Sequence, residues 1–218
     1  MITLYHCHAA RSFRPLWMLE EMGLPYELKM LPFPPRVFAK DYLALNPLGT
    51  IPLMIDGETR MTESSGICHY LGIKYGPTPL MVAADDPAYG AFLNWMYFSD
   101  ATLTFPQTLV LRYGQLEPEE RRNPQVAGDY AKWFFGRLRA VEAATARAET
   151  LCADRFTAAD IVIGYALRLA DSIGLARDFG PNVAAYWARL QQRDGYKRAV
   201  AAERRAGAEQ KVAPRVHG

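Results

Sequence analysis

The sequence predicts an α/β domain followed by an all-α domain. Strand-forming and helical patterns alternate in the first third of the chain, as is typical of a small mixed sheet covered by helices. From Ala88 onward we find only helical patterns, and the composition shifts toward alanine, arginine and aromatic residues. We therefore expect an α/β domain at 1–78, a linker at 79–87 and a helical domain at 88–218.

The N-terminal segment predicts a βαβ unit. Residues 2–5 and 26–31 have strand-forming composition, and Leu16 and Leu19 recur at helical spacing between them. Gly23 is a typical helix stop. Such a unit has parallel strands joined by a right-handed crossover.

A hairpin and a helix follow. Asp56-Gly57 separates two short strand-forming runs, and this pair is a strong signal for a tight hairpin. Pro52 lies at the start of the first run, so it belongs at an edge or a special bend, where a cis bond is possible. Helical spacing then extends from 66 to 75.

Glu63, Ser64 and Ser65 lie at the predicted start of this last helix. A helix N-terminus presents unpaired N–H groups and a positive dipole end, which bind anions. Glu63 adds the opposite sign, so the pair Glu63-Ser64 suits a zwitterion. The alternative is that a serine only caps the helix and Glu63 is solvated.

The second domain has patterns for several amphipathic helices. Residues 88–112 predict two helical pieces with a break near Phe105-Pro106, and 129–148 and 187–200 predict further helices. Thr157 and Asp160 form a capping-box pattern. We interpret Asp160 as a folding anchor instead of a catalytic acid.

Composition excludes several classes of function. The net charge is +2 with acids and bases interspersed, so we expect no nucleic-acid partner. The three cysteines are widely separated, which predicts neither a disulfide framework nor a zinc or other metal site. With neither a signal peptide nor a membrane span in the pattern, we expect a cytoplasmic protein.

The stretches LYHCHAARSFRPLWMLEEMGLPYEL and NPLGTIPLMIDGETRMTESSGICHYL resemble the glutathione transferases. The resemblance implies a thioredoxin-like βαβ-ββα domain followed by a helical bundle, with glutathione as the co-substrate. It also implies a homodimer and a small hydrophobic electrophile as second substrate. In this family a cis-proline and a Glu-Ser pair hold glutathione, and the matching residues here are Pro52 and Glu63-Ser64.

The resemblance also implies which side chains bind the substrates. The residues expected to bind glutathione are Lys40, Thr50, Ile51, Pro52, Glu63 and Ser64. The residues expected to form the pocket for the electrophile are Trp95, Phe98, Phe105 and Tyr113. Aromatic residues at these positions indicate an apolar, planar substrate.

The residue that activates the thiol departs from the family pattern. Serine-type members place a hydroxyl a few residues before the arginine matched here by Arg14, where this sequence has Ala9 and Ala10. Our hypothesis is that Ser12 donates a hydrogen bond to the thiolate and Arg11 supplies charge. Tyr5 and Cys7 are further candidates, and the alternative is that Ser12 only caps the first helix.

Three functions remain open. The first is conjugation of glutathione to an electrophile. The second is a glutathione-dependent thiol-disulfide oxidoreductase that uses Cys7 as nucleophile, although Cys7-His8-Ala9-Ala10 lacks the second cysteine of a C-x-x-C pair. The third is a non-catalytic binding protein, because a fold does not guarantee its chemistry.

Overall fold

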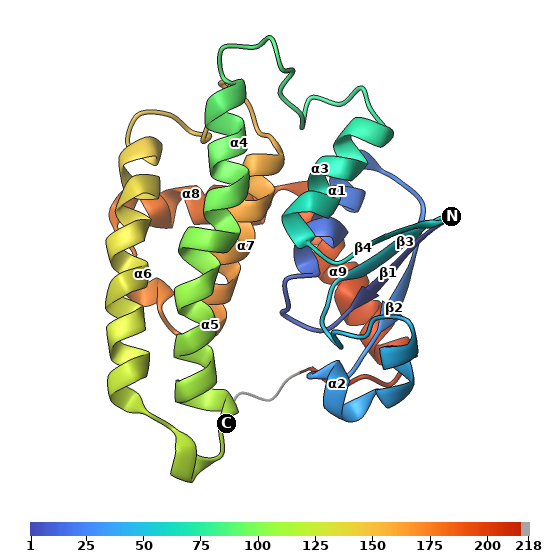
Figure 1. Ribbon diagram of the computed structural model, residues 1–218. Helices are drawn as coiled ribbons and strands as arrows, with labels where there is room; N and C mark the ends of the chain where they lie inside the picture. Colours follow the sequence, from blue (N-terminus) through green and yellow to red (C-terminus); the bar gives the residue numbers. More distant parts are fainter. Residues whose placement is uncertain (215–218) are drawn as a thin grey trace. The chain divides into compact units, whose positions relative to one another are not determined.

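The computed structural model of the protein describes residues 1–214 and divides into two units (Figure 1). Unit 1 contains residues 1–78 together with the described residues from 191 onward, and unit 2 contains residues 79–190. The last helix, expected in the helical domain, therefore belongs to the unit that carries the sheet. Tyr196 of that helix packs edge-to-face against Phe13 and Trp17 of the first helix of the chain.

Unit 1 is built on a four-stranded sheet in the order β2-β1-β3-β4. The strands are β1 (Ile2–His6), β2 (Tyr26–Met30), β3 (Leu53–Asp56) and β4 (Thr59–Met61). β1 pairs in parallel with β2, while β3 is antiparallel to both β1 and β4. The predicted βαβ unit and the predicted hairpin are both confirmed.

The helices of unit 1 are α1 (Phe13–Met22), α2 (Pro35–Phe38), the 3-10 helix η1 (Lys40–Ala44), α3 (Ser64–Lys74) and α9 (Asp194–Glu209). α1 packs against both α3 and α9, so most of its residues are buried. It ends at Gly23, whose φ of 64° is left-handed, as the predicted helix stop requires.

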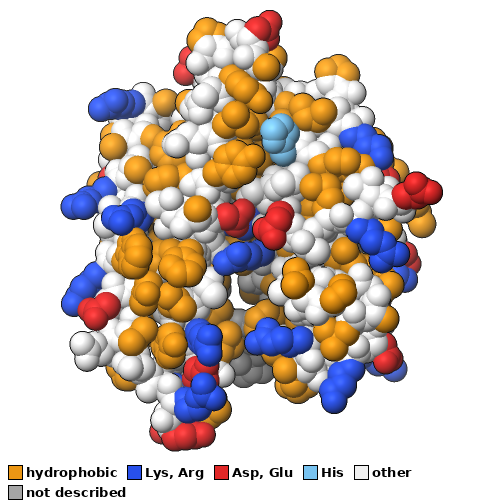
Figure 2. Space-filling model, viewed as in Figure 1, with side chains coloured by type: hydrophobic (Ala, Val, Ile, Leu, Met, Phe, Trp, Pro, Cys, Tyr) orange, Lys and Arg blue, Asp and Glu red, His pale blue; other side chains and the backbone are white. Residues whose placement is uncertain are grey.

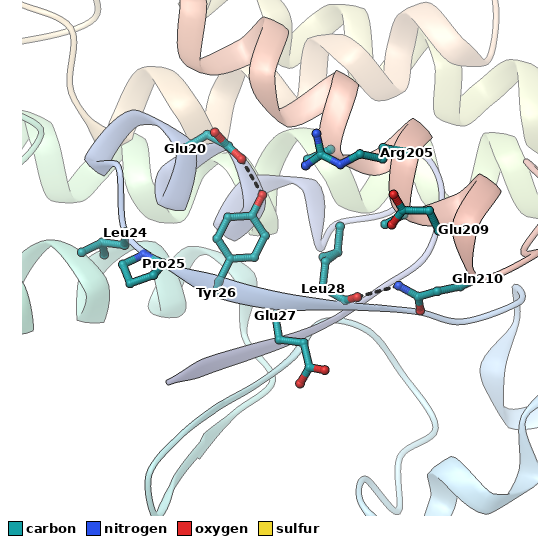
Figure 3. Close-up of a pocket in the computed structure, with 11 residues that line it drawn as sticks. Glu20, Leu24, Pro25, Tyr26, Glu27, Leu28, Arg205, Glu209 and Gln210 are labelled. Atoms are coloured by element: carbon teal, nitrogen blue, oxygen red, sulfur yellow. Dashed lines mark hydrogen bonds between the residues drawn. The ribbon is translucent and has the colours of Figure 1, made fainter.

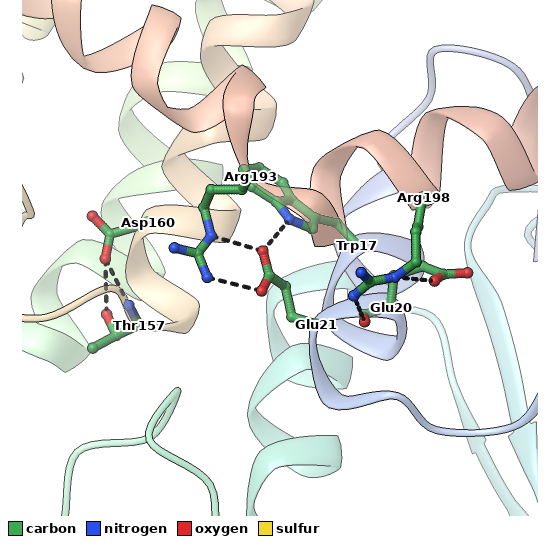
Figure 4. A network of polar contacts seen from close by, with 7 residues as sticks. All are labelled: Trp17, Glu20, Glu21, Thr157, Asp160, Arg193 and Arg198. Carbon is green, nitrogen blue, oxygen red and sulfur yellow. Dashed lines mark hydrogen bonds and ion pairs between the residues drawn. The ribbon is translucent and has the colours of Figure 1, made fainter.

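Charged and aromatic contacts join α9 to α1 (Figure 4). The Arg193 guanidinium donates two hydrogen bonds, of 2.8 and 2.9 Å, to the carboxylate of Glu21. Trp17 donates its indole N–H to the same carboxylate at 2.9 Å. A forked arginine–carboxylate pair is geometrically specific. It therefore fixes the start of α9 against the C-terminal end of α1.

Gln210, just after α9, binds the outer edge of β2. Its amide nitrogen donates to the carbonyl of Leu28 at 2.8 Å, and its amide oxygen accepts the N–H of Met30 at 2.8 Å. The side chain thus bonds to the strand as a neighbouring strand would. A cavity of about 460 Å³ opens beside this contact, and Figure 3 shows Gln210 reaching Leu28 at its wall.

Unit 2 contains α4 (Tyr89–Phe98), α5 (Phe105–Leu111), α6 (Pro124–Thr145), α7 (Ala158–Ser172) and all but the last two residues of α8 (Pro181–Gln192). The two expected helical pieces are α4 and α5, and α5 begins at Phe105 as predicted. The break is a change of helix type, because the π-helical segment Ser99–Thr104 joins α4 to α5. Pro106 lies in the first turn of α5, where the missing N–H is tolerated.

The expected linker is anchored to unit 2. The carbonyl of Leu80 accepts the N–H of Ala158 at 2.8 Å. Arg155 donates to the carbonyls of Pro79 and Met81 at 3.1 and 3.0 Å. The segment has no regular secondary structure, as predicted, but the backbone of residues 79–81 is held by hydrogen bonds.

The predicted capping box at the start of α7 is confirmed (Figure 4). Asp160 accepts the N–H of Thr157 at 2.8 Å, and it also accepts the N–H of Leu151 and the hydroxyl of Tyr186. Its side chain is fully buried, and this burial raises the pKa of the carboxyl despite those hydrogen bonds. The contacts join three segments of unit 2.

A second carboxylate, Glu142 of α6, binds the start of α8. It accepts the N–H groups of Asn182 and Val183 at 3.1 and 2.9 Å, and the Asn182 amide at 2.7 Å. Partial burial raises the pKa of Glu142, but these hydrogen bonds outweigh it and the net pKa lies below the ordinary value of 4.5. The ionised form is therefore the one that stabilises the fold.

We expect Glu142→Gln to lower the free energy of unfolding at pH 7 by about 1 kcal/mol, a value discounted for partial exposure. Because the folded pKa is depressed, this stabilisation is present above the unfolded pKa and is lost as the pH falls through the folded pKa. Urea unfolding at pH 7 and at pH 3 measures the difference. The exposed Glu120→Gln is the control, and a gap between wild type and Glu142→Gln that widens in acid would contradict this interpretation.

Candidate active site

Ser64 is the first residue of α3, and its hydroxyl is positioned by an arginine of α1. Arg14 is fully buried and donates from Nη1 to Ser64 Oγ at 2.8 Å. Glu63 precedes the helix in extended conformation, and its side chain is exposed. The predicted placement of Glu63-Ser64 at a helix N-terminus is confirmed, with Glu63 as the N-cap residue.

The sequence did not predict that Arg14 positions the Ser64 hydroxyl. In the sequence analysis, Arg14 is used only to align the turn with the family pattern. The available signal is its location inside the apolar run of α1, where an arginine needs a partner. The structure shows that one such partner is Ser64.

The backbone before β3 is held at Thr50. The hydroxyl of Tyr42 and the amide of Asn46 both donate to the Thr50 carbonyl, at 2.8 and 2.9 Å. The next peptide bond, Ile51-Pro52, is cis. Pro52 is buried and Ile51 half-buried, so the predicted special bend at this proline is confirmed.

Lys40 lies elsewhere on unit 1. It begins η1 and borders a cavity of about 550 Å³. The residues that line this cavity are Tyr5, Leu31, Val37, Phe38, Ala39, Lys40, Asp41, Tyr42 and Leu45. Neither Glu63 nor Ser64 lines this cavity, and the expected contact of Lys40 with glutathione stays a prediction.

Ser12, the predicted thiol donor, is buried at the start of α1. Its side chain is 0% exposed, and its Oγ accepts the N–H of Cys7 at 3.4 Å. The hydroxyl therefore faces its own loop, and the role of Ser12 as thiol donor stays a prediction. Ser12 occupies the N-cap position of α1, as the alternative expected, but its side chain makes no cap hydrogen bond. Arg11, beside it, is partly exposed.

Cys7 is equally enclosed. Its side chain is 0% exposed, and Sγ lies 3.8 Å from the carbonyl oxygen of Pro32. A nucleophilic cysteine must reach its disulfide partner, so this burial disfavours the oxidoreductase alternative.

The turn that follows Cys7 has an unusual backbone, because Ala9 has a φ of 55°.

The four aromatic residues expected around the electrophile separate into different groups. Trp95 and Phe98 form an edge-to-face pair with centroids 5.3 Å apart. Phe105 instead packs against Tyr130 and Trp133 of α6, at 6.3 and 6.4 Å. Tyr113 lies under the Arg112 guanidinium. Their ring contacts are therefore with different neighbours, and the pocket expected from all four stays a prediction.

Residues 1–214 contain no group of three His, Cys, Asp or Glu side chains arranged to hold a metal ion. Within the same part of the chain, no helix has the length and apolarity needed to cross a membrane.

Comparison with known proteins agrees with this geometry. Residues 10–72 match the family model described as the N-terminal domain of glutathione S-transferase. Glutathione S-transferase hmp2 of Hypomyces subiculosus is 30% identical over 94% of this chain and 100% of its own length. Glutathione S-transferase GstB of Escherichia coli K12 is 28% identical over 92% and 98%.

A solved structure shows the same fold. Glutathione transferase URE2P6 from Phanerochaete chrysosporium, in complex with oxidized glutathione, is 25% identical and superposes with a TM-score of 0.81 over 94% of this chain and 97% of its own. The thioredoxin-like fold of unit 1 and the nearly full-length match to hmp2 lead to one conclusion. The protein belongs to the glutathione S-transferase family of enzymes.

Proposed function

We propose that the protein conjugates glutathione to a small apolar electrophile, with the γ-glutamyl end of glutathione bound by Glu63 and Ser64. The observation that carries this proposal is the Arg14–Ser64 hydrogen bond of 2.8 Å. A buried arginine holds a serine hydroxyl at a helix N-terminus, directly beside an exposed carboxylate. This arrangement presents both signs of charge within one short segment.

The γ-glutamyl group matches that segment chemically. Its α-carboxylate fits the N-terminus of α3, where unpaired N–H groups and the Ser64 hydroxyl donate hydrogen bonds. Its ammonium fits the exposed carboxylate of Glu63. The cysteinyl unit pairs with the backbone of Ile51, beside the held carbonyl of Thr50, and Lys40 extends toward the glycyl carboxylate.

The reaction needs a thiolate. A cysteine-like thiol has a pKa near 8.5, so lowering it by about 2 units requires roughly 2.7 kcal/mol of preferential stabilisation of the anion. The partly exposed Arg11 and the N-terminus of α1 supply positive potential at the turn after β1. The thiolate then forms a bond to carbon of the electrophile, and the leaving group departs with the electron pair.

The electrophile is planar and apolar in this proposal. Trp95 and Phe98, partly exposed on α4, form the aromatic pair that supports it. Edge-to-face aromatic pairs offer a flat apolar surface to an aryl ring.

The assembly is a homodimer in the cytoplasm. Phe105, Tyr130 and Trp133 form an aromatic cluster in which Phe105 and Trp133 are 47% and 43% exposed. Figure 2 shows hydrophobic side chains gathered on the face of α5 and α6. Exposed apolar clusters of this kind mark protein–protein contacts, and a second copy covers this one.

Ultraviolet absorbance of bound thiolate against pH, combined with turnover of a model aryl halide, tests the proposal. We expect wild type to turn over the halide and to show a thiol pKa near 6.5, about 2 units below the free value. Arg11→Ala should raise that pKa by about 1 unit, which corresponds to roughly 1.4 kcal/mol, while the matched Arg11→Lys keeps the charge and most of the effect.

The alternatives give different results. Glutathione binding without turnover of any aryl halide would identify a non-catalytic binding protein. Reduction of a mixed glutathione disulfide that disappears in Cys7→Ser would identify the oxidoreductase, despite the burial of Cys7.

A further inference from the structure

We propose that Glu203 of α9 is a positioning residue that holds the turn after β1 in the conformation that stabilises the glutathione thiolate. This inference rests on the proposed function, because it concerns the turn where the thiolate forms. Glu203 lies on the C-terminal helix, far in sequence from the turn. Its side chain is buried within unit 1, with the residue 4% exposed.

One carboxylate oxygen of Glu203 contacts the end of β1 and the middle of the turn. Oε1 lies 2.9 Å from Nε2 of His6, the last residue of β1. The same oxygen accepts the backbone N–H of Ala9 at 3.0 Å. A single buried acceptor thus fixes the distance between the strand end and the middle of the turn.

Ala9 needs this support because its backbone is left-handed. Its φ of 55° is unfavourable for a residue with a Cβ. Such a conformation persists only where the surroundings over-determine it. A charge-assisted hydrogen bond from the Ala9 N–H to a buried carboxylate is a suitable source of that constraint.

A second contact, between His8 of the turn and the chain just after α9, also holds the turn. Nε2 of His8 lies 3.0 Å from the carbonyl oxygen of Val212, just beyond α9. Gly207, one helical turn after Glu203, leaves the space for this imidazole. A Cβ at that position would lie 2.5 Å from His8 Nε2 and 3.2 Å from Val212 O.

The turn directs the groups that we assign to the thiolate. After Ala9, the N–H of Ala10 donates to the carbonyl of Cys7 at 3.3 Å, and the chain then enters α1 through Arg11. If the Ala9 peptide rotates, Arg11 and the N–H groups of the turn change direction. Arg14 lies within α1, which packs against both α3 and α9, and it donates a hydrogen bond to Ser64. Because that packing holds Arg14 in place, loss of Glu203 should affect the thiolate and leave binding nearly intact.

The experiment compares Glu203→Ala with Glu203→Gln and Gln210→Ala in the full-length protein. We expect Glu203→Ala to raise the pKa of bound glutathione thiol by about 1 unit and to lower kcat at pH 6.5 about tenfold, with the glutathione Kd within about threefold. Glu203→Gln keeps an acceptor oxygen for the Ala9 N–H and should restore most of kcat. Gln210→Ala removes two hydrogen bonds between the end of α9 and β2 and should leave both quantities unchanged.

Gly207→Ala provides a second route to the same change, because its new methyl group displaces His8 without removing Glu203. It should also raise the thiol pKa. An unchanged thiol pKa in folded Glu203→Ala, or an equal loss of kcat in Gln210→Ala, would overturn the positioning role.

Hydrogen exchange separates this inference from the proposed function. The Ala9 amide, bonded to a buried carboxylate, should exchange at least tenfold faster in Glu203→Ala than in wild type, measured in the protein alone. Faster exchange with no aryl-halide turnover by wild type would contradict the proposed function only. Unchanged exchange of Ala9 would contradict the role of Glu203 itself.

Discussion

Replacing Ser64 with alanine should weaken glutathione binding by roughly ten- to a hundredfold. The serine hydroxyl is buried, with the residue 3% exposed, and it is oriented by the fully buried Arg14. Loss of a charge-assisted hydrogen bond at a desolvated site costs about 1.5–3 kcal/mol, which is roughly one to two decades in affinity. Isothermal titration with glutathione measures the change.

The adjacent Ser65→Ala is the matched control. Ser65 is also buried in the first turn of α3, with the residue 5% exposed, but we assign it no contact with glutathione. Its Kd should stay within about threefold of wild type. A double variant, Glu63→Ala with Ser64→Ala, that bound glutathione as wild type does would show that the γ-glutamyl end lies elsewhere.

Local patterns predicted the elements of unit 1 because their signals are short in range. Asp56-Gly57 predicts the hairpin, and Gly57 indeed has a φ of 61° between β3 and β4. The Thr157–Asp160 spacing predicts a capping box because both partners lie within one helical turn. In each case the chemistry that decides the structure lies within a few residues.

Long-range packing could not be predicted in the same way. The amphipathic pattern of α9 shows that one face is buried, but not that the face meets Phe13 and Trp17 of α1. The direction of the Ser12 hydroxyl depends on the turn before it, where Ala9 adopts a left-handed conformation that its residue type does not signal. The contact of Glu203 with the Ala9 N–H depends on the packing of α9 against α1 and on the left-handed backbone of Ala9.

Replacing Asp160 with alanine should lower the free energy of unfolding by about 3–5 kcal/mol, the largest stability change that we expect of any single substitution in unit 2. Asp160 accepts hydrogen bonds from Thr157, Leu151 and Tyr186, all at a fully buried position. Without the carboxylate, the buried Tyr186 hydroxyl and two backbone N–H groups lose this acceptor, and each desolvated donor adds to the cost.

Chemical unfolding monitored by tryptophan fluorescence and circular dichroism measures this loss. Tyr186→Phe is the partial control, since it removes only one donor and should cost about 1 kcal/mol. Because Asp160 acts here as a folding anchor, kcat per folded molecule should stay unchanged below the unfolding transition. A folded Asp160→Ala protein with wild-type stability and lost turnover would instead assign the residue to catalysis.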